Sequence, residues 1–470
     1  MPIVTRKFLP GFGVRSRLDN SLRPVKGTAV IKTNWAIAVI AIIAAPWASA
    51  VTQNEPQKSP APAPLTRDDV LSVKDGRFYL YGRPFAEISF NKFDLFWELY
   101  GELAAGRPLT DDNPMVQAQT RALRDLHKMG FKTIRVFGLP WGPSGPDSYS
   151  DPQKRVNLYA AIDKALDLCD RYHIRPVWCL GSDTFTDSKL DRGWKYGEEQ
   201  LRELMANPNS RGRQLLYRYL DETISRYKNR RTILMWEIAN EETLSADIGD
   251  KDGIYEGQRM PTLKDVSLFC DDVAKRIKTD DPLRLVNNGG SSMRESQWHL
   301  YQRQGWPRDT FEEQFKCVDL LFGHSAVDVF DIHYYPDGKL GYAISGTNGQ
   351  PAYLKVKGYM AIAKRIGKPL MIGEFGFAPA PKSDEKTWKM NPDYFESYAD
   401  VVAAKPWVQH ALNGVVDAGV QLAYWWTYQS DRPIDQKSTT RFDIDLKRNP
   451  ELLKCFIDAN RRLQHKLRAR

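Results

Sequence analysis

The amino-acid sequence predicts an α/β protein, a (β/α)8 TIM barrel with an N-terminal β-hairpin and long loops on the C-terminal face. Eight short apolar segments, rich in β-branched and aromatic residues, have the length and composition of buried strands. Segments with helical spacing of apolar residues separate them. Strands that alternate with helices pair in parallel, and eight such units close into a barrel. The predicted strands are residues 85–91, 132–138, 175–180, 233–239, 284–288, 329–335, 369–375 and 422–427.

The helices follow from a second periodicity. Residues 117–129, 156–172 and 215–227 place Leu, Ile, Tyr and Met on one side of a helix and charged residues on the other. Long polar connections mostly follow the predicted strands. These connections, residues 93–114, 182–213, 243–262 and 289–309, are therefore expected to build the upper face of the barrel, where such folds hold their functional residues.

The first 66 residues are expected to lie outside the barrel. Residues 1–34 are basic, the run WAIAVIAIIAA at 35–45 is apolar, and Ala48 and Ala50 supply an A-x-A cleavage motif. Residues 1–50 are thus predicted to be a signal peptide, which implies a secreted or periplasmic protein. The alternative is an uncleaved N-terminal membrane anchor. Residues 51–66 form a Pro/Ala-rich linker, expected to be extended, and residues 67–470 form the barrel domain.

The start of the barrel domain has a hairpin pattern. Residues 70–85, VLSVKDGRFYLYGRPF, alternate apolar and polar side chains around Asp75-Gly76, a dipeptide typical of two-residue hairpin turns. We expect this hairpin to close the bottom of the barrel.

Charge and cysteine content exclude two classes of function. The net charge is +9, but seven of the 67 Lys and Arg residues and only one of the 58 acids lie in residues 1–50. The rest of the chain is near neutral, which argues against nucleic-acid binding. The five cysteines show no CxxC spacing, so a zinc site is not indicated; disulfides stay possible if the protein is exported. Cys169 and Cys179 are expected to be core residues.

Two predicted strands each end in a glutamate. Residues 232–242, TILMWEIANEE, place Asn240 and Glu241 where an apolar run stops, and residues 369–377, PLMIGEFGF, do the same for Glu374. A single glutamate at a strand end is ordinarily a helix cap or an ion-pair partner. In a parallel barrel, however, all carboxyl ends of strands meet at one face, so a pair of such carboxylates indicates a catalytic site.

The order of polar residues along the strands resembles clan A of the glycoside hydrolases, most closely family 5, which includes endo-β-mannanases and cellulases. The resemblance spans roughly residues 68–450. The residues that carry it are Arg135 in TIRVFG, Asn240-Glu241, His333 and Tyr335 in DIHYYP, Glu374, and Trp425 in YWWTY.

The resemblance implies a retaining β-glycosidase (EC 3.2.1.-) that acts by double displacement on a β-1,4-linked polysaccharide or oligosaccharide, with β-mannan favoured over β-glucan. Strands four and seven face each other across a barrel, which brings the two carboxyls to about 5 Å, the spacing of a retaining pair. Neither a cofactor nor a metal is implied. The resemblance implies that Glu374 is the nucleophile and Glu241 the acid/base. It implies that Arg135 and Tyr335 orient the nucleophile and that Asn240 binds the sugar 2-hydroxyl. It further implies that His333 forms hydrogen bonds within the site and that Trp425, or its neighbour Trp426, stacks under the sugar.

Several alternatives stay open at this stage. Arg135 could form a structural ion pair, and Tyr335 and Trp425 could be core aromatics. Glu237 and Glu242, which flank the acid, are interpreted as supporting or surface groups. The alternatives for the whole protein are a non-catalytic carbohydrate-binding barrel and a metal-dependent barrel hydrolase of another bond, for which His333 beside Asp331 would be the starting pair.

Two departures from the family pattern concern the site. Glu242 stands where a proline commonly follows the Asn-Glu pair. The third strand ends in CLGSD, residues 179–183, without the polar aromatic residue often found there, and this bears on the identity of the sugar.

Overall fold

The structure is a computed structural model of the chain, and it describes residues 65–140, 144–185, 198–248, 260–334, 352–376, 398–428, 444, 446 and 449–468. All described residues belong to one unit, Pro64–Arg470. The leader, its apolar run and most of the linker lie outside the described residues, so their predicted roles stay predictions.

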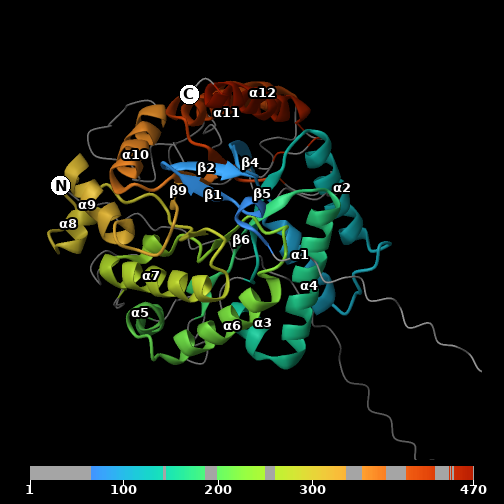
Figure 1. Ribbon diagram of the computed structural model, residues 1–470, viewed down its shortest axis with the longest axis horizontal. Helices are drawn as coiled ribbons and strands as arrows, with labels where there is room; N and C mark the ends of the chain where they lie inside the picture. The colour runs from blue at the N-terminus through green and yellow to red at the C-terminus, as the bar shows by residue number, and fades with distance from the viewer. Residues whose placement is uncertain are drawn as a thin grey trace, which may run out of the picture. The chain divides into compact units, whose positions relative to one another are not determined.

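Eight parallel strands form the centre of this unit, one for each predicted segment (Figure 1). Neighbours in the sheet follow the order β8-β7-β6-β5-β4-β11-β10-β9. A parallel bridge between Asn287 and Val329, with a hydrogen bond of 2.8 Å from Asp328 N to Val286 O, joins the two ends of that order. The predicted barrel is therefore confirmed. The strands are β4 Glu87–Asn91, β5 Thr133–Phe137, β6 Arg175–Cys179, β7 Met235–Glu237, β8 Val286–Asn287, β9 Phe330–Tyr334, β10 Leu370–Phe375 and β11 Leu422–Trp425.

Helices surround the strands (Figure 1). Several begin where a side chain accepts hydrogen bonds from the first free N–H groups. Asn113 and Asp151 cap two helices that also have proline at their first position, and Thr262 with Asp265 forms a capping box at a third. The helices are α1 Asp94–Ala104, α2 Pro114–Lys128, α3 Ser144–Ser150, α4 Pro152–Arg171, α5 Glu198–Ala206, α6 Arg211–Tyr227, α7 Leu263–Asp280, α8 Gln297–Tyr301, α9 Phe311–Phe322, α10 Ala352–Ile366, α11 Tyr398–Ala418 and α12 Pro450–Arg468.

The predicted hairpin is part of a three-stranded antiparallel sheet, β1 Ser72–Lys74, β2 Arg77–Leu80 and β3 Arg83–Pro84. Two turns with positive φ at both central residues make it: the predicted Asp75-Gly76, and Tyr81-Gly82, which the alternation pattern did not indicate. Gln421 holds the sheet to the barrel through three hydrogen bonds of 2.7–3.1 Å to the backbone of Phe78 and Phe85.

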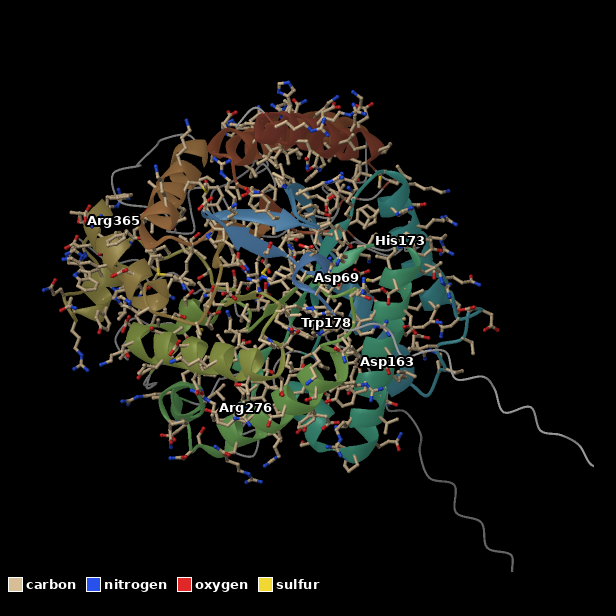
Figure 2. The ribbon with its side chains drawn as sticks, in the orientation of Figure 1. Asp69, Asp163, His173, Trp178, Arg276 and Arg365 are labelled. Carbon is tan, nitrogen blue, oxygen red and sulfur yellow. The ribbon has the colours of Figure 1, made fainter. Side chains whose placement is uncertain are left out.

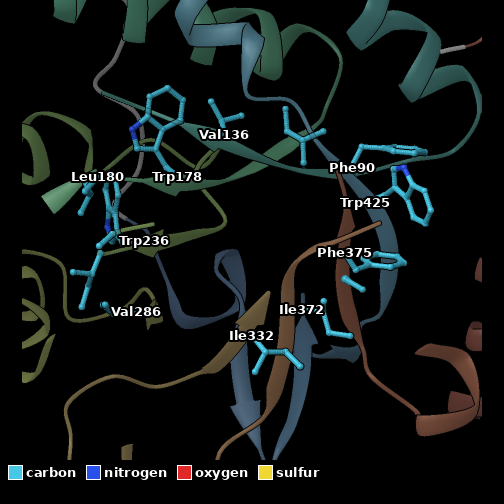
Figure 3. Packing of buried hydrophobic residues seen from close by; sticks show 14 of the residues in the cluster. Phe90, Val136, Trp178, Leu180, Trp236, Val286, Ile332, Ile372, Phe375 and Trp425 are labelled. Atoms are coloured by element: carbon cyan, nitrogen blue, oxygen red, sulfur yellow. The ribbon is translucent and has the colours of Figure 1, made fainter. Parts of the chain in front are cut away.

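Apolar side chains divide into an inner and an outer set. The inner set lies at the bottom of the barrel and joins Phe78 and Leu80 of the small sheet to strand residues such as Met371, Leu422 and Tyr424. The outer set fills the space between strands and helices (Figure 3). It includes residues from every strand, namely Phe90, Val136, Trp178, Trp236, Val286, Ile332, Ile372, Phe375 and Trp425. The strands are thereby packed on both faces.

Charged side chains lie mainly on the outer helices. Asp163 on α4, Arg276 on α7 and Arg365 on α10 are examples, whereas Trp178 on β6 is fully buried (Figure 2). None of the helices in the described part of the chain has both the length and the apolar character needed to cross a bilayer. All five cysteines are free and buried, as expected for Cys169 and Cys179, and none forms a disulfide.

Candidate active site

The two predicted carboxylates meet at the C-terminal end of the barrel. Glu374 is the fifth residue of β10, and Glu241 follows β7 by four residues. One carboxylate oxygen of each, together with a ring nitrogen of His333 on β9, lie within 4.8 Å of one another. This separation is that of a nucleophile and an acid/base that act on the same bond, not that of a pair that holds a water between them.

Arg135 holds the base of the site together. Its guanidinium forms a fork on Glu237, with the closest contact at 2.6 Å, and donates to Glu374 at 2.8 Å. The arginine and Glu237 have no exposed side-chain surface, and Glu374 keeps 8 %. The same guanidinium donates at 2.9 Å to Asn91 at the end of β4 and to Asn240.

This network ties four strands, β4, β5, β7 and β10, to one cation. Burial acts against the charge of Arg135, but the carboxylates of Glu237 and Glu374 outweigh it and raise its pKa well above the ordinary value. A permanent cation therefore lies against the nucleophile candidate.

Glu241 has an unusual backbone conformation. Its φ is +56°, in the left-handed region that residues with a side chain rarely adopt. Its N–H donates to the carbonyl of Gly289 at 2.7 Å. Gly289 must be glycine, because its φ is +71° and an added Cβ would lie 2.0 Å from the carbonyl oxygen of Ala239. Backbone strain of this kind is typical of functional positions.

The protonation states suit a general acid. Burial raises the pKa of Glu241 to about 7, and the positive charge of Arg135 lowers it only in part. The side chain still exposes 29 % of its surface, so it is accessible from outside the barrel. Burial also lowers the pKa of His333 to about 4. Its Nδ1 lies 3.1 Å from Glu241 and 3.6 Å from Glu374, so a neutral imidazole links the two carboxyls.

The chain is similar to known mannan hydrolases, although no protein-family model matches it. It is 22% identical to mannan endo-1,4-beta-mannosidase 4 of Solanum lycopersicum. The 322 residues compared are 65% of this chain and 72% of the relative. Among solved structures it resembles a glycoside hydrolase family 5 mannosidase of Rhizomucor miehei, with a TM-score of 0.58, 15% identity, and coverage of 86% of this chain and 100% of that one.

A second solved structure, the endo-beta-1,4-mannanase of Thermotoga petrophila, gives a TM-score of 0.54 at 16% identity, covering 81% of this chain and 77% of that one. The predicted resemblance to glycoside hydrolase family 5 is confirmed. The structural likeness shows that the eight strands described above have the arrangement of the family 5 barrel.

Trp425 does not occupy the position that the family 5 resemblance suggested. Its ring is fully buried and points outward, where it packs edge-on against Phe375 and against Phe456 of α12, at centroid distances of 5.2 and 5.4 Å. Trp426 is half-buried and stacks on Phe93 at 5.1 Å, next to Phe137, whose ring lies under Arg135. Of the two tryptophans, Trp426, the alternative named above, is therefore the one on the side of the site.

Asn240 lies beside Arg135, and its predicted role toward the sugar stays a prediction. Its Oδ1 accepts from Arg135, which leaves its NH2 group to donate to a sugar hydroxyl. Its backbone N–H donates at 3.3 Å to Asp183, after β6, and burial raises the pKa of Asp183 to about 6. Tyr335 lies outside the described residues, so its role stays a prediction.

Three residues support the site. Asn91 and Asp183 were not assigned from the sequence, and Glu237 was interpreted there as a supporting or surface group. Glu237 is fully buried beneath Arg135, and Glu242 is buried as well, so neither is a surface group. The signal for all three was present, since each is a polar residue in or directly after an apolar strand. Such residues face either a site or a paired charge.

Proposed function

We propose that the protein is a retaining β-glycosidase that hydrolyses β-1,4-linked mannan or mannooligosaccharides. The observation that carries this proposal is the pair Glu241 and Glu374, within 4.8 Å at the mouth of a family 5 barrel. The Solanum and Thermotoga proteins, by their names, act on mannan, and this supports mannan over glucan. For a non-catalytic binding barrel, the retained carboxyl pair would have no function.

In the first step, Glu374 attacks the anomeric carbon while Glu241 gives its proton to the departing glycosidic oxygen. The bond from carbon to that oxygen breaks, and an ester between the sugar and Glu374 forms. Arg135 donates to Oε1 of Glu374 at 2.8 Å and so orients the carboxylate. A carboxyl with a pKa of about 7 is protonated in about half the molecules at neutral pH, which suits this acid role.

In the second step, Glu241 is ionised and removes a proton from water, whose oxygen attacks the anomeric carbon and displaces Glu374. Two inversions give net retention of the β configuration. His333, 3.1 Å from Glu241, stays neutral in this pH range because its pKa is about 4, and its ring can share a proton with the carboxyl.

The location proposed for this enzyme is outside the cytoplasm. The basic leader, the apolar run at 35–45 and the A-x-A motif support export, and a polysaccharide substrate would be met there. An uncleaved leader would instead anchor the same barrel to a membrane.

Hydrolysis of a panel of β-mannan, cellulose, mixed-linkage glucan and xylan tests the substrate, and azide tests the roles. We expect Glu374→Ala and Glu241→Ala to abolish turnover and to stay folded. With an activated aryl β-mannobioside, azide should rescue Glu374→Ala and give the α-glycosyl azide, because the small anion takes the place of the nucleophile. The β-azide is expected from Glu241→Ala. The reverse pattern would exchange the two assignments.

A further inference from the structure

Glu242 is a buried carboxyl directly after the proposed acid/base that the mechanism does not use. Only 3 % of its surface is exposed, and it starts the 3-10 turn Glu242–Ser245. Its side chain contacts Asn288, in the connection after β8, and Cys270 of α7. The carboxyl is thus directed into the wall of the barrel, between β7, β8 and α7.

Glu242 and Asn288 face each other through complementary groups. Asn288 Nδ2 donates to Glu242 Oε1 at 2.6 Å. The remaining atoms of the two groups, Glu242 Oε2 and Asn288 Oδ1, are both buried and have no hydrogen-bond partner within the described residues. With an ionised carboxylate both atoms would be acceptors, and no donor reaches either of them within the described residues, since Asn288 Nδ2 and the Cys270 thiol both lie on Oε1. A carboxylic acid instead carries an O–H on Oε2, which can donate to Oδ1 and satisfy both atoms.

The surroundings of Glu242 favour the acid form. Burial raises its pKa to about 8, and the hydrogen bond from Asn288 lowers it only in part. The titratable groups that interact with it are the thiol of Cys270 at 3.8 Å from α7, and the carboxyls of Asp183 after β6, Glu237 on β7 and Asp331 on β9. No cation is among them in the part of the chain that the structure describes.

The contact belongs to a seam that joins the connection after β7 to the connection after β8. Its members lie on both sides of the acid/base. They are Ala239 N to Asn288 O at 3.2 Å, Glu241 N to Gly289 O at 2.7 Å, Glu242 to Asn288, and Thr243 Oγ1 to Ser291 Oγ at 2.9 Å. Within this seam Glu241 takes part through its backbone N–H, and the Glu242–Asn288 pair is the side-chain contact made by the next residue in the chain.

This position matters because Glu241 adopts the left-handed conformation, φ +56°, which a free chain would leave. A displacement of a catalytic group by about 1 Å can cost about 100-fold in rate. A restraint on the next residue is therefore a restraint on the proton donor.

We propose that Glu242 is a positioning residue, whose paired contact with Asn288 holds Glu241 at the glycosidic oxygen. The inference rests on the proposed function, because it assigns a task to the acid/base of that reaction. It predicts that a neutral group of the same shape replaces Glu242 without loss, since a Gln amide accepts from Asn288 Nδ2 and donates to Oδ1.

The test compares Glu242→Ala, Glu242→Gln and Asn288→Ala on mannohexaose and on 2,4-dinitrophenyl β-mannobioside. For Glu242→Ala and Asn288→Ala we expect kcat on mannohexaose to fall by about 30- to 100-fold with KM little changed, because only transition-state proton transfer is lost. Glu242→Gln should stay within about threefold of the parent enzyme and keep the basic limb of its pH profile.

Azide separates a misplaced acid/base from a simple loss of folded enzyme. The dinitrophenolate leaving group departs without a proton, and azide attacks the sugar ester without a base. Azide should therefore accelerate Glu242→Ala and yield the β-mannosyl azide. The matched control is Glu87→Ala at the opposite end of the barrel, a buried carboxyl whose pKa burial also raises, to about 7. Its loss should lower stability and leave kcat per folded molecule and the azide response unchanged.

Three outcomes would overturn the inference. Glu242→Ala could retain full kcat, its loss could be insensitive to azide, or Glu242→Gln could be as impaired as Glu242→Ala. If Glu242→Ala does not fold, Asn288→Ala gives the same comparison, with Glu242 in place. Lack of parent activity on every sugar substrate would refute the proposed function instead, and this result is distinct because it appears before any variant is made.

Discussion

Replacement of Arg135 should destabilise the protein, because it removes the contacts of the arginine and also leaves the buried charge of Glu237 without a partner. Arg135→Met removes the cation from a site where Glu237 is fully buried and where the arginine forms its fork. Removal of one partner of a buried ion pair costs about 3–5 kcal/mol, because the other charge is left uncompensated. We expect a loss of about 4 kcal/mol in the free energy of unfolding at pH 7, at the middle of that range. Urea unfolding followed by tryptophan fluorescence and circular dichroism measures it.

The double variant Arg135→Met with Glu237→Gln separates this cause from lost packing. Once the second charge is gone, the protein should recover about 2 kcal/mol relative to Arg135→Met alone, a coupling within the range for residues in direct contact. Both variants should have lost activity, since Glu374 has lost the donor at 2.8 Å. A cost below about 1 kcal/mol for Arg135→Met, or a double variant no more stable than the single one, would refute the reasoning.

Four further predictions concern catalysis and processing. Above pH 7, kcat/KM should fall about tenfold per pH unit, because Glu241 acts as acid only while protonated and its pKa is about 7; Glu241→Gln, assayed on an activated aryl glycoside, should lack this limb. Trp426→Ala should raise KM about fivefold by loss of sugar stacking, whereas Trp425→Leu should mainly lower the melting temperature. Dialysis against EDTA should leave kcat unchanged; a loss that Zn²⁺ or Mn²⁺ restores would favour the metal-dependent alternative. Secreted from a Gram-negative host, the protein should begin at Val51 by N-terminal sequencing; an intact leader in the membrane fraction would contradict this.

Much of the fold could be predicted because each barrel strand is covered on both sides. Strands such as β5 and β6 are buried along their whole length, so they appear in the sequence as short, largely apolar segments in which a charged residue such as Arg135 stands out. Glu241 and Glu374 were found by position alone, as acids where such runs stop. The hydrogen bonds of Arg135 were harder to foresee, because they join residues 44 to 239 positions apart in the chain.

The choice between Trp425 and Trp426 depended on the direction of one strand's side chains. Along β11, Leu422 and Tyr424 belong to the inner cluster, whereas Ala423 and Trp425 belong to the outer one. Alternation then directs Trp426 inward. The sequence LAYWW ends in two tryptophans, and nothing in the sequence tells which of the two side chains points into the barrel. The resemblance to family 5 gave the pair, and the inner position of Tyr424 decides between its members.

At the nucleophile candidate, Glu374, the regular in-and-out alternation of strand side chains would have given the wrong direction. On β10, Met371 faces inward and Ile372 outward, so strict alternation would turn Glu374 outward and Phe375 inward. The structure has the opposite: Phe375 packs in the outer cluster and Glu374 contacts Arg135. The register of β10 against both neighbours shifts between Ile372 and these residues. A bulge of this kind redirects a side chain at the rim of a barrel. It passes through Gly373, where an added Cβ would lie 2.6 Å from Asp331 and 2.9 Å from His333, so a side chain there would displace two buried groups. Gly373 therefore lies where the strand departs from regular geometry and Glu374 turns toward Arg135, a departure that no period-2 pattern expresses.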